Sequence, residues 1–236
     1  MLAFFVFLAA FAFVTPYRED TSDVDEYVDE VLSEHLPRIV EKANLDAYKI
    51  PDFYFNVQDT VLEAEEFEGT VLFHSGNFTG LNTVNRKFCL YSPRSPGKNR
   101  IVCNVILPRV SVRYRGRYEA TEGLTTFHGD RVQQRDFYSE VLLRDIEAQI
   151  ELTKLRDGEE PSITNLLLLG EGEVSKIFQY NDVSQNRLFN QFYVPFHKIS
   201  GPFYQKCAHL FQKIVYSSYR EVLEKSFSTV DYPERY

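Results

Sequence analysis

The sequence contains no tryptophan, a single methionine and only three cysteines in 236 residues. Three cysteines cannot build the dense disulfide framework that stabilises many small secreted domains. A hydrophobic core must therefore supply the stability, and a chain of this length can bury about 70% of its unfolded surface. No internal repeat, low-complexity tract or Gly/Ser linker divides the chain, which predicts a single domain.

The motifs of common catalytic and cofactor sites are also missing from the sequence. It has no Gly-x-Ser-x-Gly elbow for a nucleophilic serine and no glycine-rich phosphate loop. The five histidines lack the spacing that places two imidazoles on one helical face for zinc. The acidic run from Glu63 to Glu68 is expected to be a solvated loop, without the apolar surroundings that separate the pKa values of an acid/base pair. These absences predict a protein that is not an enzyme, with no metal and no cofactor.

The net charge of −8 argues against a nucleic-acid partner, which would require clustered lysines and arginines to neutralise phosphates. Basic residues gather locally at Arg113, Arg115 and Arg117. Their spacing of two places them on one side of a strand, so we expect a solvated face and no anion site.

Residues 1–16 are predicted to be a signal peptide. The opening segment MLAFFVFLAAFAF has no charged side chain and suits the apolar core of a signal peptide, whereas a spanning helix needs about 20 apolar residues. Ala10-Phe11-Ala12 offers a cleavage site, and a retained membrane anchor is the alternative. Export predicts a secreted, extracellular protein without stable membrane insertion. It would also make Asn77, in Asn77-Phe78-Thr79, usable for N-glycosylation.

One disulfide bond is predicted between Cys89 and Cys103. The two residues lie symmetrically about a turn at Pro96-Gly97, so a hairpin would place them opposite each other, within the reach of a disulfide. Cys207 has apolar neighbours and is expected to be a buried, inert thiol. Pairing of Cys207 with another molecule is the alternative.

Helical periodicity marks both ends of the chain. Apolar residues recur every three or four positions from Asp23 to Ala43, which predicts an amphipathic helix with a kink or restart near His35 and Leu36, because Pro37 removes a hydrogen bond. A second apolar stripe predicts a long helix from Phe203 to Phe227. A shorter helical stretch over 188–196 is expected to be interrupted by Pro195, Gly201 and Pro202.

Between the helices, from about Gly69 to Leu169, the period changes to two, which indicates strands with one buried face. Pro108 is expected to mark a bend or bulge, and the alternation slips again after Asp145. Bulges curve a sheet, and a curved sheet around an aromatic-rich helix can leave an apolar pocket. The residues predicted to line this pocket are Val105, Leu107, Val112, Tyr114, Leu142, Ile150, Leu167, Leu210, Phe211 and Ile214.

Three short segments carry a resemblance to a known family. Lys49-Ile50-Pro51-Asp52 follows the first helix, Gly80, Leu81 and Arg86 stand in TGLNTVNRKF, and FYVPFHKISGPF leads to SFSTV in the C-terminal helices. With the order of the elements, they resemble the group 7 mite allergen family. The resemblance implies a secreted protein related in fold to juvenile-hormone-binding and takeout-like carriers and to one half of the bactericidal/permeability-increasing protein. It thereby implies lipid binding, and it transfers no residue-level site.

The expected fold is therefore an α+β super-roll over residues 17–236, with a curved antiparallel sheet wrapped around the long C-terminal helix and an additional N-terminal helix. The expected function is carriage or sequestration of an apolar small molecule or lipid, without catalysis. The alternative is a secreted protein-interaction domain with a solid core and no ligand pocket. A lipocalin barrel is disfavoured, because it would require a Gly-x-Trp motif near its first strand. No oligomeric state follows from the sequence.

Overall fold

The computed structural model describes residues 22–61, 65–95, 98–122, 131–154, 159–180 and 194–233. The predicted signal peptide (1–16), the Pro96-Gly97 turn and residues 188–193 of the predicted helical stretch lie outside these ranges.

The N-terminal helix forms as predicted and contains a π-helical turn just before Pro37. It comprises α1 (Ser22–Glu30), the π turn η1 (Val31–His35) and α2 (Leu36–Lys42). Pro37 lies in the first turn of α2, where a missing N–H removes no helical hydrogen bond of that segment. The buried stripe continues through all three segments, from Val24 to Val40. The expected disturbance near His35 is therefore a local change of helical pitch that leaves the apolar face unbroken.

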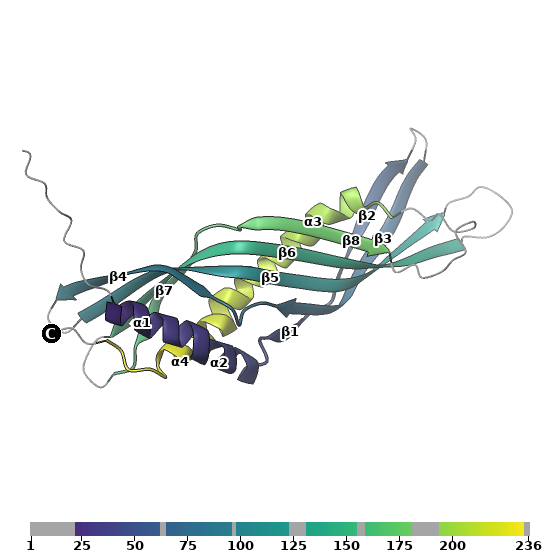
Figure 1. The fold of residues 1–236 in the computed structure, drawn as a ribbon. Helices are drawn as coiled ribbons and strands as arrows, with labels where there is room; N and C mark the ends of the chain where they lie inside the picture. Colours follow the sequence, from purple (N-terminus) through teal and green to yellow (C-terminus); the bar gives the residue numbers. More distant parts are fainter. Residues whose placement is uncertain are drawn as a thin grey trace, which may run out of the picture.

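The described residues form an antiparallel sheet of eight strands. They are β1 (Ala47–Ile50), β2 (Phe53–Val61), β3 (Glu65–Thr79), β4 (Asn85–Ser95), β5 (Lys98–Glu122), β6 (Arg131–Lys154), β7 (Ser162–Leu168) and β8 (Glu173–Tyr180). The order along the sheet is β1-β3-β5-β6-β7, and β2, β4 and β8 pair with β3, β5 and β6 respectively. The long strands β5 and β6 form the spine, and the shorter strands extend it at either end (Figure 1).

Two parts of the sheet differ from the sequence-based prediction. The strands β1 and β2 precede Gly69, where the alternation was expected to begin. The acidic run, predicted as a loop, enters strand β3 at Glu65, where it pairs with β2. Strand β1 is short and the acidic run is strongly polar, so their extended form comes from pairing with β3 and with β2 respectively, which local periodicity does not report.

The alternation of buried residues along the spine slips at one level. Leu107 is buried and the next core residue of β5 is Val110, so the alternation slips by one residue at Pro108. On β6 the corresponding slip falls between Leu143 and Ile146, where Asp145 has a positive φ of 53°. Both slips were predicted, and together they bend the two central strands at the same level.

The disulfide bond is present as predicted. Cys89 on β4 lies directly opposite Cys103 on β5. Both side chains are buried. The bond therefore ties the β4–β5 hairpin together on its core face. Cys207 is a free cysteine, 1% exposed, in agreement with the expected buried thiol.

The C-terminal helix begins earlier than predicted. It comprises α3 (Phe196–Ile214), the π turn η2 (Val215–Tyr219) and α4 (Arg220–Phe227). Gly201 and Pro202 lie inside α3 and do not interrupt it. Pro202 is on the solvent side, and the flanking residues Ile199 and Phe203 are buried. Burial of this apolar face offsets the lost hydrogen bond, so the tertiary contacts override the local preference.

Both helices lie on the same face of the sheet and share one core with it. Figure 1 shows the C-terminal helix running diagonally across this face, from the region of β2 and β8 toward the N-terminal helix. The Tyr27 hydroxyl donates a 2.7 Å hydrogen bond to the carbonyl oxygen of Phe227. Arg86 on β4 pairs with Asp25 and Asp29 at 2.9 and 2.7 Å. These contacts fix the N-terminal helix to α4 and to the sheet.

The sheet covers only one side of α3. The solvent side of the helix presents an exposed row comprising Gln205, Lys206, His209, Gln212 and Lys213. The architecture is therefore mixed α+β, a large curved antiparallel sheet with a long C-terminal helix and an N-terminal helix. In the part of the chain that the structure describes, the sheet does not enclose the helix completely.

Candidate ligand-binding site

The first turns of α3 pack into a cluster of aromatic rings on the sheet, here called the ring cluster: Phe53, Phe73, Tyr114, Phe137 and Phe203. The ring centroid of Phe73 lies 4.5 Å from that of Phe203 and 4.9 Å from that of Phe53. The Tyr114 hydroxyl donates a 2.9 Å hydrogen bond to the Pro51 carbonyl oxygen, and burial raises the pKa of Tyr114. The ring cluster therefore fills this part of the sheet–helix interface as a solid core.

Most of the residues predicted to line a pocket are buried. Those that belong to the common core are Val105, Leu107, Val112, Tyr114, Ile150, Phe211 and Ile214. Leu210 is buried on α3, 8% exposed. Their positions suit an apolar interior, and their role in ligand binding stays a prediction.

Two of the predicted lining residues do not face this interior. Leu167 is 45% exposed on β7, and its neighbour Leu166 is the buried one. Leu142 is buried, but it alternates with Val141 and Leu143, which belong to the core, and so lies on the opposite face of β6. Both errors arise in runs of consecutive leucines and valines, where alternation cannot be seen in the sequence.

A slot opens between α3 and the connection from β7 to β8. It has a volume of about 150 Å³. Its lining is Leu143, Leu168, Leu169, Gly170, Glu171, Tyr204, Ala208, Phe211 and Gln212. Leu143 and Phe211 also belong to the core, whereas Leu169 is 45% exposed. The slot thus connects the surface with the apolar sheet–helix interface.

A hydrogen bond closes one side of the slot. The Tyr204 hydroxyl donates to the Glu171 carboxylate. Burial, together with this bond, raises the pKa of Tyr204 to about 12. The hydroxyl therefore stays protonated at neutral pH and can keep donating. Of the residues predicted to line a pocket, only Phe211 lines the slot. The sequence feature that could have indicated the other lining residues is the pair Leu168 and Leu169 directly before the Gly-Glu-Gly segment.

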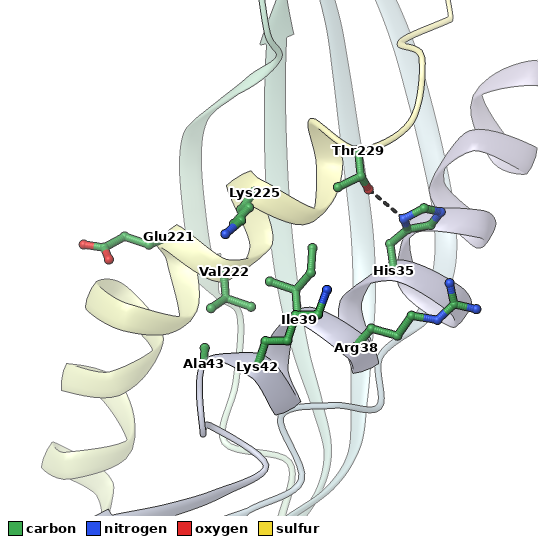
Figure 2. Close-up of a pocket in the computed structure, with 9 residues that line it drawn as sticks. All are labelled: His35, Arg38, Ile39, Lys42, Ala43, Glu221, Val222, Lys225 and Thr229. Carbon is green, nitrogen blue, oxygen red and sulfur yellow. Dashed lines mark hydrogen bonds between the residues drawn. The ribbon is translucent and has the colours of Figure 1, made fainter.

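A larger groove lies between the N-terminal helix and α4, at the other end of the C-terminal helix. Its volume is about 480 Å³. The lining is His35, Arg38, Ile39, Lys42, Ala43, Glu221, Val222, Lys225 and Thr229, drawn in Figure 2. Ile39 and Val222 are buried and form the apolar floor. The groove could not be predicted from the sequence, because its walls are almost 200 residues apart in the chain.

The walls of the groove are joined at one end by His35 and Thr229. The His35 Nδ1 lies 2.8 Å from the Thr229 Oγ1 (Figure 2). The Thr229 hydroxyl donates at 2.7 Å to the carbonyl oxygen of Ser226, so it accepts from His35, which assigns the ring proton to Nδ1. This chain of bonds ties η1 to the C-terminal end of α4.

On the outer face of the sheet, Arg113 and Arg117 form ion pairs with carboxylates of β6. The Arg113 Nε donates to the Glu140 Oε1 at 3.0 Å, and Arg117 pairs with Asp136 at 2.9 Å. Arg115 lies on the same outer face and is exposed. The prediction of a solvated face is confirmed.

Two observations concern metal-binding and nucleophilic side chains in the described residues. No group of three or more His, Cys, Asp or Glu side chains within these ranges could hold a metal ion. Burial raises the pKa of Cys207 to about 12, so its sulfur is a neutral thiol and a poor nucleophile. Within the same ranges, no helix is both long and apolar enough to cross a membrane.

No protein-family model matches the sequence, and no curated protein is similar to it. Among solved structures, a crystal structure of lipopolysaccharide binding protein is similar, with a TM-score of 0.47 and 13% sequence identity. The match covers 87% of this chain and 38% of that one, so the chain spans less than half of that protein. These comparisons do not support the resemblance to the group 7 mite allergens.

Glycosylation at Asn77 and export by residues 1–16 stay predictions. Asn77, the expected glycosylation site, is half-buried on β3 between β1 and β5. Its Oδ1 atom is buried and has no hydrogen-bond partner in the structure. The expected export depends on residues 1–16, which lie outside the described ranges.

Proposed function

We propose that the protein is a secreted carrier or sequestering protein for an apolar small molecule or lipid, and that it catalyses no reaction. The slot is the observation that carries this proposal. It opens the sheet–helix interface to the surface, and its inner wall consists of the core side chains Leu143 and Phe211. Ligand sites for apolar molecules are concave and mostly apolar, with a few polar groups that orient the ligand.

The size of the slot limits what it can hold without rearrangement. A volume of about 150 Å³ is comparable to an engineered apolar cavity that accepts a benzene ring. A lipid would insert the end of one chain between Leu143 and Phe211 and lay the remainder along the exposed Leu169. The Tyr204–Glu171 bond lies at the entrance and would open or orient the polar end. This arrangement is a partial super-roll, in which the ligand lies between α3 and the β7–β8 connection.

Native mass spectrometry of protein purified without detergent tests the proposal directly. We expect a co-purified apolar molecule, or binding of a fluorescent fatty-acid analogue by the unloaded protein. Replacing Ala208 by Phe fills the slot and should weaken binding at least about tenfold, the effect of 1.4 kcal/mol. Gln205→Phe, on the exposed side of α3, is the matched control and should leave binding unchanged. Equal affinity of folded Ala208→Phe and wild type would rule out the slot.

The solid ring cluster favours the second candidate, a secreted protein-interaction domain without a ligand pocket. Edge strand β4 supports it too, because Phe88 and Leu90 are 44% and 58% exposed on its outer face. Adjacent exposed apolar side chains of this kind are frequent at protein interfaces. If folded protein fails to bind a broad panel of lipids, this second function is the one to pursue, with Phe88→Ser and Leu90→Ser as variants.

A further inference from the structure

The groove between α2 and α4 combines an apolar floor with unpaired positive charge. Its polar lining includes the cations Arg38, Lys42 and Lys225 and one carboxylate, Glu221. Within the described residues, no ion pair joins any of the three cations to an acidic side chain. The chain as a whole has a net charge of −8. A local excess of positive charge in an acidic protein is therefore a specific feature of this groove.

The single carboxylate does not neutralise the groove. Glu221 and Lys225 are four residues apart on α4, a spacing that permits an ion pair. Figure 2 shows instead that the Glu221 carboxylate points away from the groove, while the Lys225 ammonium lies near Val222. The Lys42 side chain rises beside Ile39 on the facing helix. Cations on both walls, with the one lining carboxylate turned outward, make the groove electropositive, so an anion bound there would be attracted to it.

The apolar floor of the groove can add binding energy that exposed charges alone do not provide. Ion pairs at a surface are weak because water screens them, so two partly exposed lysines would hold a small anion such as acetate only loosely. Ile39 and Val222 are 9% and 7% exposed and form an apolar base below the charges. The groove volume of about 480 Å³ falls within the range of small-molecule sites. An apolar chain on the floor would add the binding energy that the charges alone do not provide.

We propose that this groove binds an anionic single-chain amphiphile of the fatty-acid type, at a site separate from the slot. The carboxylate accepts hydrogen bonds from Lys42 and Lys225, and the first part of the chain lies on Ile39 and Val222. The His35–Thr229 bond holds the two walls at a fixed separation, so the site is formed before the ligand arrives. Arg38 lies at the His35 end of the groove and adds to its positive potential (Figure 2).

The test compares probes that carry one part of this chemistry at a time. Dodecanoate has both the anion and the chain, acetate has only the anion, dodecanol has only the chain, and dodecyltrimethylammonium has the chain with the opposite charge. Isothermal titration below the micelle concentrations should show the tightest binding for dodecanoate, weakened by added salt. Equal binding of dodecyltrimethylammonium would overturn the proposal, because the charge would then play no part.

Variants locate the site and separate it from the slot. Lys42→Gln combined with Lys225→Gln should weaken dodecanoate binding at least about tenfold at low salt, whereas Lys213→Gln, on the exposed side of α3, should not. Ala208→Phe, which fills the slot, should leave the salt-sensitive, lysine-dependent part of dodecanoate binding unchanged, and the double variant should lose that part in this background too. Failure of the slot and failure of the groove are therefore distinguishable. The same dodecanoate affinity in folded double variant and wild type would overturn the proposal.

A membrane surface is the other source of an anionic headgroup, and vesicles distinguish it. Sedimentation with phosphatidylcholine vesicles, with and without phosphatidylglycerol, should show no binding that depends on Lys42 and Lys225. If the double variant loses binding to the phosphatidylglycerol vesicles and dodecanoate does not bind, the groove is a membrane-contact site and the proposal of a soluble amphiphile is wrong.

Discussion

Pro108 on β5 lies opposite Asp145 on β6, between the Leu107–Ile146 and Arg109–Arg144 pairs of the sheet register. In both strands the alternation of buried residues slips by one position at this level. Pro108 has no N–H to donate across the strands, and Asp145 has a left-handed backbone conformation with φ of 53°. The bend of the central strands is therefore specified by two residues that are 37 positions apart in the sequence and face each other in space.

Two glycines flank this bend, and we predict that neither tolerates alanine. Gly172 has φ of +65°, and an added Cβ would lie 3.0 Å from the Asp145 carbonyl carbon and closer still to the Arg144 carbonyl oxygen. Gly80 has φ of +103°, with the Arg109 backbone equally close. Gly80→Ala and Gly172→Ala should each lower the free energy of unfolding by about 1–3 kcal/mol, the cost of a strained backbone position. Chemical unfolding measures this directly.

Gly170 is the matched control for these substitutions. It lies in the same connection as Gly172, but a Cβ there would meet nothing within 4 Å. Gly170→Ala should leave stability within about 0.5 kcal/mol of wild type, as is usual for a surface substitution. A loss as large as that of Gly172→Ala would contradict the role assigned to the bend.

The Cys89–Cys103 bond should contribute substantially to stability. It closes a loop with a sequence separation of 14, for which the chain-entropy model expects about 3 kcal/mol. The free energy of unfolding of the Cys89→Ala/Cys103→Ala variant should therefore be lower by that amount, and the variant should unfold at a lower denaturant concentration. Dithiothreitol should shift the wild-type unfolding curve toward that of the variant and leave the variant unaffected. No shift in either experiment would contradict the prediction.

Cys207 should resist thiol reagents in the folded protein. Burial raises the pKa of Cys207 to about 12, so only about one thiol in ten thousand is ionised at pH 8, and the thiolate is the reactive form. Maleimide labelling followed by mass spectrometry should show negligible modification in native buffer and complete modification in denaturant. Rapid labelling of the folded protein would mean that α3 separates from the sheet on that timescale.

Glu140 should make the protein less stable in acid. Burial alone would raise the pKa of Glu140, but hydrogen bonds from Ser111 at 2.6 Å and Arg113 at 3.0 Å outweigh it and lower the pKa. Because the folded-state pKa lies below the unfolded-state value of about 4.3, the stabilisation is complete above that value. It is lost as the pH falls through the lower, folded-state pKa.

Glu140→Gln tests this dependence. The substitution should cost about 1–2 kcal/mol at pH 7, the net value of hydrogen bonds to a charged group. Its difference from wild type should shrink as the pH falls below about 4. Glu26→Gln, an exposed carboxylate on α1, is the control and should change stability little. A difference from wild type that stays constant down to pH 2 would contradict the assignment.

Much of the architecture could be predicted from the sequence because it is written in local periodicity. The spacing of apolar residues from Val24 to Val40 predicted the N-terminal helix, and alternation predicted the strands on either side of Pro108. The symmetric placement of Cys89 and Cys103 about a turn predicted their bond. Each of these patterns depends only on residues near one another in the chain, whose side chains point to a common face in a helix or strand.

The tertiary structure decided the features that depend on distant partners. Strand β1 has only four residues, too few to show a period, and extends because it pairs with β3. Leu142 and Leu167 belong to continuous apolar runs, in which the neighbouring strand and helix determine which side chains are buried. Both openings also arise only in the folded chain: the slot lies where the β7–β8 connection meets α3, and the groove where His35 meets Thr229. The sequence by itself therefore determined the elements and their apolar faces, whereas packing between segments far apart in the chain decided where apolar surface remains open to a ligand.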